Sequence, residues 1–395
     1  GLRSAVGELL LQAKRCRNCF ALRALRVRHT APSVSMSFLS PTWVEKAKEL
    51  ASAATELGKR ASDIAVEAVE GLKAGQRPEL VEIEGRTLVL VKQIGEGGYA
   101  FVHLARDPQS GARFAVKRML AQEEEAARNA AAELALLKSL DHPNIVGLVA
   151  SSVRPLDGGR GDEYLLALEY CAGGSVAKYL VPRVAGGRPR PLREAKLLAI
   201  FVDTCKAIAH LHSLKPPVAH RDLKAENVLE GAKGVHKLCD FGSATTAVVD
   251  CATASRKERL DAEDEISRMT TMWNRAPEMV DLHRGKRIDH RVDVWALGTL
   301  LYTLALRRHP FETQSSLQIL NGGYEMPKAS ETPYAPSTLQ LIIEMLAQDP
   351  DRRPSVFDIT SKAALLLAEA GTDYGEDDEA VEGGGERGGA YGGLG

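Results

Sequence analysis

Apolar residues recur along this chain with different periods, and each period predicts a different element. Between residues 41 and 74 they recur at alternating spacings of four and three, which predicts one long amphipathic helix. The apolar stripe consists of Trp43, Ala47, Leu50, Ala54, Leu57, Ala61, Ile64 and Ala68. Charges of both signs cover the opposite face. We expect this helix to pack on the rest of the protein or on a partner helix; the alternative is an interfacial helix with its stripe inserted into a membrane surface.

Residues 75–82 contain glycine and proline and are expected to form a linker. Beyond them, short apolar runs such as 87–91 and 164–170 predict strands, whereas residues 121–140 have a helical pattern. A second long helix is predicted after Pro191. Its stripe is Leu197, Phe201, Cys205, Ile208 and Leu211, which is typical of a buried core helix. These elements belong to one domain, expected at residues 83–368.

Composition limits the classes of function. The chain has 395 residues, 44% of them hydrophobic, and a formal net charge of -1, so it can bury a large core. A balanced charge gives no overall attraction to nucleic acid, and no nucleic-acid partner is expected. The six cysteines are scattered and are expected to be reduced thiols of a cytoplasmic protein. Cys16 and Cys19 have CxxC spacing, but no second pair completes a metal site.

The two ends differ from the rest in composition. Residues 1–35 are rich in arginine and contain one acid, Glu8, which resembles a transit peptide; sequence upstream of a start at Met36 explains the same facts. Residues 369–395 are acidic and glycine-rich, and we expect them to be disordered.

A glycine-rich loop follows the strand at 87–91. Glycines let backbone amides approach the phosphates of a nucleotide closely, so this loop is a candidate phosphate-binding element. Ala100 replaces a third glycine of the usual pattern and is small enough for the turn to form. The candidate nucleotide contacts here are Ile94, Gly95, Glu96, Gly97, Gly98 and Val102.

Lys117 is the charged residue that ends the apolar run Phe114–Lys117. Comparison with the Val-Ala-Ile-Lys motif predicts that Lys117 binds the α- and β-phosphates of ATP, and Ala115 is a further nucleotide contact. A lysine at this depth needs a counter-charge, and Glu133 of the helix at 121–140 is the candidate. Three glutamates in the first turn of that helix, at 123–125, are expected to be solvated.

The sequence His-Arg-Asp-Leu-Lys-Ala-Glu-Asn at residues 220–227 places an acid, a lysine and an amide in one short loop. An Asp-Phe-Gly sequence follows, beginning at Asp240. In such a loop Asp222 can act as base toward a hydroxyl, while Lys224 neutralises charge on a transferring phosphoryl group. Asn227 and Asp240 offer the hard oxygen ligands that suit Mg²⁺.

The order of these motifs matches the protein-kinase signature, and the chain resembles the Numb-associated kinase family, which includes the adaptor-associated and cyclin-G-associated kinases. The likeness covers about residues 83–367 and rests on the motifs at 96–100, 171–174, 238–245, 263–266 and 275–279. It implies an α+β, two-lobed protein kinase fold, with a small antiparallel sheet and one helix in the first lobe and a larger, mainly helical second lobe. It also implies an extra helix following the activation segment, and ATP and Mg²⁺ as cofactors.

The resemblance assigns further roles to named residues. Backbone groups of Glu169 and Cys171 would bond adenine at the hinge between the lobes, Leu168 would be the gatekeeper, and Leu229 would lie under the base. Residues 240–278 would form the activation segment.

Scaffold roles follow from the same resemblance. Thr271 would touch both the catalytic aspartate and the catalytic lysine, and Asp293 would bond the backbone of the catalytic loop. Arg353 would form a buried ion pair with Glu278.

Six hydroxyl residues of the activation segment are candidate phosphorylation sites, and Arg221 could bind a phosphate there. They are Thr245, Thr246, Thr253, Ser255, Ser267 and Thr270.

The sequence therefore predicts an ATP-dependent Ser/Thr protein kinase, because every charged catalytic position is filled. The alternative is a pseudokinase scaffold tethered through residues 41–74, for which Ala100 is the candidate defect. The resemblance implies a clathrin-adaptor-like protein as substrate and a role in vesicle traffic, in the cytoplasm or at the periphery of vesicle membranes.

Overall fold

The computed structural model describes residues 79–97, 100–156, 158–181, 191–311 and 315–371. The chain divides into two units, residues 1–79 and residues 80–395. The leader at 1–35, the helix predicted at 41–74 and the acidic end from residue 372 lie outside the described residues. Among the helices that are described, none has the length and apolar character required to span a membrane.

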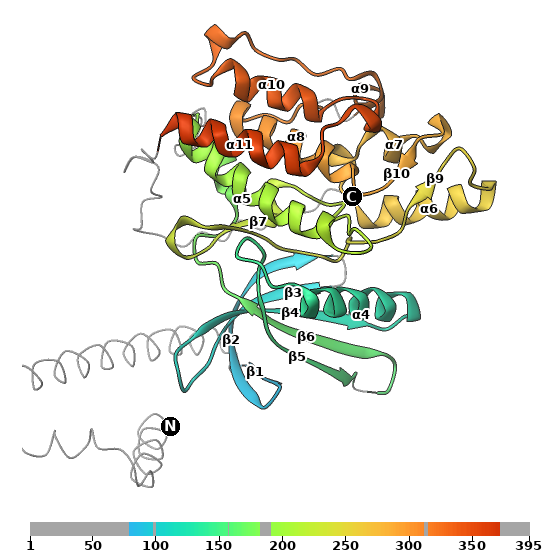
Figure 1. Ribbon diagram of the computed structural model, residues 1–395. Helices are drawn as coiled ribbons and strands as arrows, with labels where there is room; N and C mark the ends of the chain where they lie inside the picture. Colours follow the sequence, from blue (N-terminus) through green and yellow to red (C-terminus); the bar gives the residue numbers. More distant parts are fainter. Residues whose placement is uncertain (1–78, 98–99, 157, 182–190, 312–314, 372–395) are drawn as a thin grey trace, which may run out of the picture. The chain divides into compact units, whose positions relative to one another are not determined.

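The smaller lobe is built on one six-stranded sheet with the strand order β1-β2-β3-β4-β6-β5 (Figure 1). The strands are β1 (Glu79–Ile83), β2 (Arg86–Gly97), β3 (Ala100–Arg106), β4 (Arg113–Ala121), β5 (Leu148–Pro155) and β6 (Asp162–Glu169). The first strand corrects the predicted linker at 75–82. Val81 and Ile83 are buried and alternate with an exposed Leu80, so the sheet begins before residue 83.

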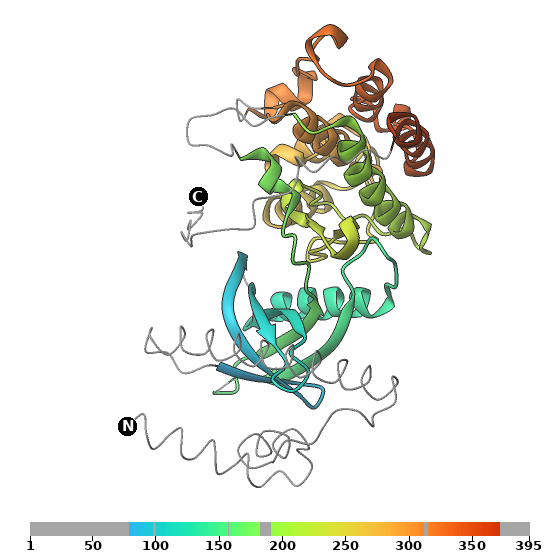
Figure 2. The same ribbon diagram turned by 90° about the vertical axis from the view of Figure 1, so that its left-hand side faces the viewer.

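Alternation along the strands gives the sheet two different faces. On β4 and β6, Val116, Leu165 and Ala167 belong to a small apolar core on one face. Leu166 lies on the other face and joins the main core together with residues of α4 (Glu124–Ser139). In two perpendicular views α4 lies along the sheet (Figures 1 and 2). The sheet thus presents one face, carrying Lys117, toward α4 and the second lobe.

The connection between the lobes depends on close backbone contact at Gly173. Its N–H donates to the carbonyl of Glu230 at 3.0 Å, and the N–H of Glu230 donates to the carbonyl of Gly174 at 2.8 Å. A Cβ atom on Gly173 would lie 2.7 Å from that carbonyl oxygen, so a larger residue cannot fit without movement. Gly174 has φ +68°, which favours glycine.

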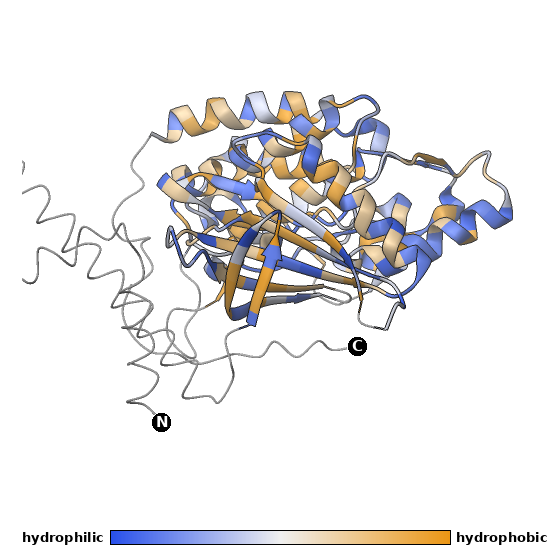
Figure 3. Cartoon of the chain, turned by 90° about the horizontal axis from the view of Figure 1, so that it is seen from below, coloured by the Kyte–Doolittle hydropathy of each residue, from blue (hydrophilic) through white to orange (hydrophobic). Residues whose placement is uncertain are grey.

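The larger lobe is mainly helical. Its helices are α5 (Glu194–Ser213), α6 (Arg256–Met269), α7 (Pro277–Val280), α8 (Val292–Leu306), α9 (Ser316–Asn321), α10 (Pro336–Met345) and α11 (Val356–Ala370). Two short antiparallel pairs join them, β7 (Val228–Glu230) with β8 (His236–Leu238), and β9 (Val249–Asp250) with β10 (Arg287–Ile288). Nearly all residues of α8 are buried, as expected of a helix that is apolar all round. Apolar residues gather in the strands and packed helices, whereas α6 is mostly hydrophilic (Figure 3).

Helix α6 corrects one expectation from the resemblance. The extra helix was expected to follow the activation segment, but α6 lies inside residues 240–278, ahead of α7. Ser255 caps its first turn through a reciprocal pair of bonds with Glu258, which fixes where the helix begins.

The ion pair expected between Arg353 and Glu278 is present and buried. Two guanidinium nitrogens donate to the two carboxylate oxygens at 2.6 and 2.7 Å, and both side chains have almost no exposed surface. This pair ties the residues after α10 to the end of the activation segment.

We predict that Arg353→Met lowers the free energy of unfolding by about 3–5 kcal/mol, because the carboxylate of Glu278 stays buried without a partner. The measurement is urea denaturation of the wild type and the variant. Arg352→Met is the matched control: Arg352 is exposed, and its replacement should change the free energy by no more than about 0.5 kcal/mol. Equal effects of the two substitutions would contradict the structural role of the pair.

Candidate active site

A buried lysine forms the centre of the site. Lys117 lies on β4 opposite Val102 of β3 and Leu166 of β6. Its Nζ atom donates to Oε1 of Glu133 at 2.6 Å and to Oδ1 of Asp240 at 2.8 Å. Although burial disfavours the charged form, the two carboxylates raise the pKa of Lys117 well above its ordinary value. The pairing predicted between Lys117 and Glu133 is present, and Asp240 is a second partner that the sequence did not indicate.

The loop at residues 220–227 places a second group of polar atoms around Asp222, which is 8% exposed. Oδ2 of Asp222 accepts from Nζ of Lys224 at 2.8 Å, and Oδ1 accepts from the backbone N–H of Thr271 at 3.0 Å. Lys224 also donates to the hydroxyl of Thr271 at 2.8 Å. The activation segment therefore contacts both residues predicted to act on the hydroxyl, as expected for Thr271.

The two groups are joined through the backbone. The N–H of Cys239, the residue before Asp240, donates to the carbonyl of Asn227 at 2.9 Å. Asn227 donates its amide hydrogens to the carbonyl and to Oδ2 of Asp222, at 2.8 and 3.3 Å. Because the Nδ2 atom of Asn227 is used in this way, its Oδ1 oxygen is left as a ligand atom.

The residues predicted as metal ligands fit Mg²⁺ in chemistry and accessibility. The side chain of Asp240 remains 49% exposed although Oδ1 is bonded to Lys117. Burial opposes its ionisation, but the charge of Lys117 outweighs this effect and lowers the pKa of Asp240 to about 2, so the carboxylate is ionised at neutral pH. Across the described residues there is no cluster of three or more His, Cys, Asp or Glu side chains that could hold a metal. Two protein oxygens suit Mg²⁺, which takes its remaining ligands from water and substrate phosphates.

Two residues of the site have left-handed backbone conformations. Arg221 has φ +67° and Asp240 has φ +63°, regions that non-glycine residues seldom occupy. The fully buried carboxylate of Asp293 accepts from the N–H groups of His220 and Arg221 at 2.8 and 2.9 Å, and from the His212 ring at 3.0 Å. Asp293 thus holds the strained loop in place, in agreement with the expectation for this residue.

The predicted adenine contacts form a partly exposed apolar surface. Strand pairing places Ala115 opposite Leu168, two positions from Lys117 on the same face of the sheet. Val102, Ala115, Leu168 and Leu229 are all of intermediate exposure, and Ile94 is 42% exposed. Apolar residues left half open beside a cation fit a flat base attached to phosphates.

The loop and hinge candidates are placed around this surface. Gly95 pairs with Val102, and Glu96 and Gly97 continue the strand; Gly98 lies outside the described residues. Glu169 ends β6, and its carboxylate contacts Lys237 at 2.9 Å. No acceptor among the described residues is bonded to the backbone N–H of Cys171, which leaves that donor for a ligand.

The sequence missed the contacts of α6. Glu125, expected to be solvated, accepts from Arg268 at 2.6 Å, and Glu265 accepts from Arg221 at 2.8 Å. The acidic motif at 263–266 contributed to the family resemblance, but it did not indicate which residues its carboxylates contact.

We predict that Asp240→Asn abolishes the Mg²⁺ dependence of nucleotide binding, because the substitution removes the charge of one metal ligand. In the wild type, ATP with Mg²⁺ at about a hundred times its Kd should raise the melting temperature by about 5 °C, and EDTA should reduce this shift. The variant should show the same small shift in both conditions. Asp264→Asn, an exposed residue of α6, is the control and should behave as the wild type does. A full Mg²⁺-dependent shift in Asp240→Asn would contradict the assignment.

Comparison with known proteins agrees with this geometry. The model of the protein kinase domain matches residues 88–364. A probable serine/threonine-protein kinase of Dictyostelium discoideum is 42% identical over 290 residues, which cover 73% of this chain and 35% of that protein. A second from the same organism is 38% identical over 292 residues, covering 72% of this chain and 25% of that protein. The serine/threonine-protein kinase ppk30 of Schizosaccharomyces pombe is 32% identical over 278 residues, which cover 70% of this chain and 28% of that protein.

This chain thus spans between 25% and 35% of the length of these relatives. The matched region contains the whole described site, from Lys117 through Asp222 and Asn227 to Asp240. The chain therefore belongs to the protein kinase domain family and carries a serine/threonine kinase domain of it.

Proposed function

We propose that this chain is an active Ser/Thr protein kinase that transfers the γ-phosphoryl group of ATP to a protein hydroxyl. The observation that carries the proposal is the convergence of two groups: Lys117 bonded to both Glu133 and Asp240, and Asp222 bonded to Lys224 and joined to Asp240 through Asn227. Every charged position needed for phosphoryl transfer is filled, which favours an enzyme over a pseudokinase scaffold.

In this proposal each residue of the site has a task. The hydroxyl oxygen of the substrate attacks the γ-phosphorus, the bond from that phosphorus to the β,γ-bridging oxygen breaks, and ADP leaves. Asp222 orients the hydroxyl and accepts its proton, and the Thr271 N–H and Lys224 Nζ hold the carboxylate in position. Lys117 binds the α- and β-phosphates. Asn227 and Asp240 would hold Mg²⁺, which neutralises phosphate charge when bound.

A cavity of about 510 Å³ adjoins this base on the side of the larger lobe. The residues that line it include Lys224 and Thr271, together with Glu226, Trp273, Asn274 and Leu300. Because two of the residues that line it are bonded to Asp222, the segments of a substrate that flank the acceptor hydroxyl can bind there.

The finer assignment is to the Numb-associated kinases, with threonine of a clathrin-adaptor-like protein as the acceptor. The motifs at 96–100, 171–174, 238–245 and 263–266 support it, as does the presence of an extra helix, α6, although this helix lies within the activation segment and does not follow it. With that substrate the enzyme would work in the cytoplasm, at the periphery of vesicle membranes. Residues 41–74 would supply the attachment, to a partner helix or to the membrane itself.

The reaction is tested with Asp222→Asn, which keeps the size of the side chain and removes the base. We expect kcat to fall by about 10²–10⁴, because a positioned base contributes that much. The assay follows incorporation of phosphate into a purified clathrin-adaptor subunit, a general protein substrate and buffer alone. Equal rates in the wild type and the variant would favour the scaffold, and phosphorylation of the general substrate alone would contradict the adaptor proposal.

The attachment is tested by flotation of the full chain with vesicles of neutral and of anionic lipid. If the helix binds the membrane, the wild type should float and a deletion of residues 41–74 should remain in the dense fraction, because the stripe of Trp43, Leu50, Leu57 and Ile64 would be lost. The deletion should keep its kinase activity, which serves as the folding control. If the two proteins are distributed alike between the floating and dense fractions, residues 41–74 do not attach the protein to the membrane.

A further inference from the structure

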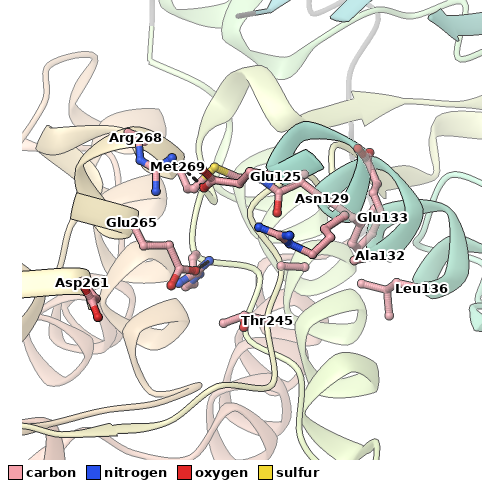
Figure 4. Close-up of a pocket in the computed structure, with 15 residues that line it drawn as sticks. Glu125, Asn129, Ala132, Glu133, Leu136, Thr245, Asp261, Glu265, Arg268 and Met269 are labelled. Atoms are coloured by element: carbon pink, nitrogen blue, oxygen red, sulfur yellow. Dashed lines mark hydrogen bonds and ion pairs between the residues drawn. The ribbon is translucent and has the colours of Figure 1, made fainter. Parts of the chain in front are cut away.

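Helix α6 contacts three separate parts of the catalytic apparatus. Arg268 donates to Glu125 in the first turn of α4 at 2.6 Å. The backbone carbonyl of Met269 accepts from the hydroxyl of Ser243, the residue after the Asp-Phe-Gly sequence. Glu265 accepts from Arg221 of the catalytic loop at 2.8 Å. Figure 4 shows Asp261, Glu265 and Arg268 on the opposite side of a cavity of about 410 Å³ from Asn129, Glu133 and Leu136 of α4.

The contact at Arg221 involves a buried guanidinium group. The side chain of Arg221 is 8% exposed, and its Nε atom donates to the carbonyl of Ser243 at 2.7 Å. Arg221 precedes Asp222 directly and has a left-handed backbone, so a shift of its side chain would be transmitted to the base. A guanidinium at this depth needs an anion, and Glu265 is the acid that the structure places on it.

A phosphate on the activation segment could fill the same role, but three of the six candidate hydroxyls already have other partners in the fold. Thr245 lines the cavity with Arg221, and its hydroxyl accepts from the N–H of Ala247 at 3.1 Å. The hydroxyl of Thr270 is buried and donates to the carbonyl of Ile266. Ser255 caps the first turn of α6. These three residues therefore act in the fold with their hydroxyls unmodified.

Helix α6 is suited to hold a carboxylate at a fixed point. Only Ala262 and Ile266 of its fourteen residues are buried, so apolar packing anchors a single face. Its ends are fixed by the Ser255 cap and by the Met269 contact, and Glu265 lies one turn before the latter. The acid is thus presented by a helix whose two ends are both held.

We propose that Glu265 is a positioning residue of the kinase reaction: it takes the place of a phosphate at Arg221 and holds the catalytic loop against Ser243 in the unmodified protein. This inference rests on the proposed kinase activity. It implies that the domain reaches its working geometry without phosphorylation of its activation segment.

The test compares Glu265→Gln with Glu263→Gln, both assayed after phosphatase treatment verified by mass spectrometry. Glu263 is exposed on the same helix and serves as the matched control. The wild type and Glu263→Gln should keep their kcat within about twofold, whereas Glu265→Gln should lose about ten- to a hundredfold, the range expected for a bond to a charged group. The KM for ATP should change much less than kcat, because Lys117 keeps its partners. Glu265→Asp, which keeps the charge, should recover part of the loss.

A second measurement does not depend on activity. The N–H groups of Ala219 and Thr245 donate to each other's carbonyls at 2.8 and 2.9 Å, joining the catalytic loop to the activation segment. Hydrogen exchange at these two amides should accelerate in Glu265→Gln and stay unchanged in Glu263→Gln. If the wild type shows no Asp222-dependent activity, the proposed kinase function fails. The exchange measurement still tests whether Glu265 holds the catalytic loop.

Two outcomes would overturn the inference. One is a Glu265→Gln protein with the kcat and the amide protection of the wild type. The other is a wild type that loses its activity on phosphatase treatment, because a phosphate would then be the group on which Arg221 depends.

Discussion

The site depends on a buried cation that neither lobe could hold alone. Lys117 is 8% exposed, and a buried ammonium group without counter-charges would lose its proton. One carboxylate comes from α4 of the small lobe and the other from Asp240 beyond the hinge. Because both bonds end on the same nitrogen, moving either element away leaves a buried charge with one partner fewer. The position of α4 and the position of the metal ligand are therefore coupled through a single atom.

The second constraint concerns the backbone. Arg221 and Asp240 adopt a conformation that costs about 1–3 kcal/mol each, and such strain persists only where the surroundings enforce it. For Arg221 the constraint comes from Asp293, whose carboxylate accepts hydrogen bonds from the N–H groups of two successive loop residues. Asp293 is presented by α8, a helix buried on almost all sides, so it cannot move to relax the loop. The rigid core of the large lobe thus fixes the direction in which Asp222 points.

The sequence predicted those parts of the site whose residues carry their own chemistry. A lone lysine in an apolar run, and a helix whose Glu133 stands directly before an apolar stripe, predict that Lys117 pairs with Glu133. The loop with Asp, Lys and Asn predicts the catalytic group around Asp222. The contacts of Glu125 and Glu265 could not be predicted, because an acid in a helix is solvated unless a distant arginine approaches it, and α4 and α6 lie far apart in the chain. The strand at Glu79–Ile83 was missed for a related reason: its burial alternates over five residues only, and the preceding glycine and proline indicated a linker.

The charge at Arg221 has a consequence for control. A phosphate carries about −1.5 to −2 charges and can be removed, whereas a glutamate carries one charge and cannot. In a domain where Glu265 neutralises Arg221, phosphorylation cannot switch activity at this point, because the anion is part of the chain. The cavity between α4 and α6 is lined by charges of both signs, among them Glu125, Arg128, Asp261 and Arg268, and these are likewise part of the chain. With the anion at Arg221 built in, control would act on other features, such as the position of α4 or the hydroxyl that reaches Asp222.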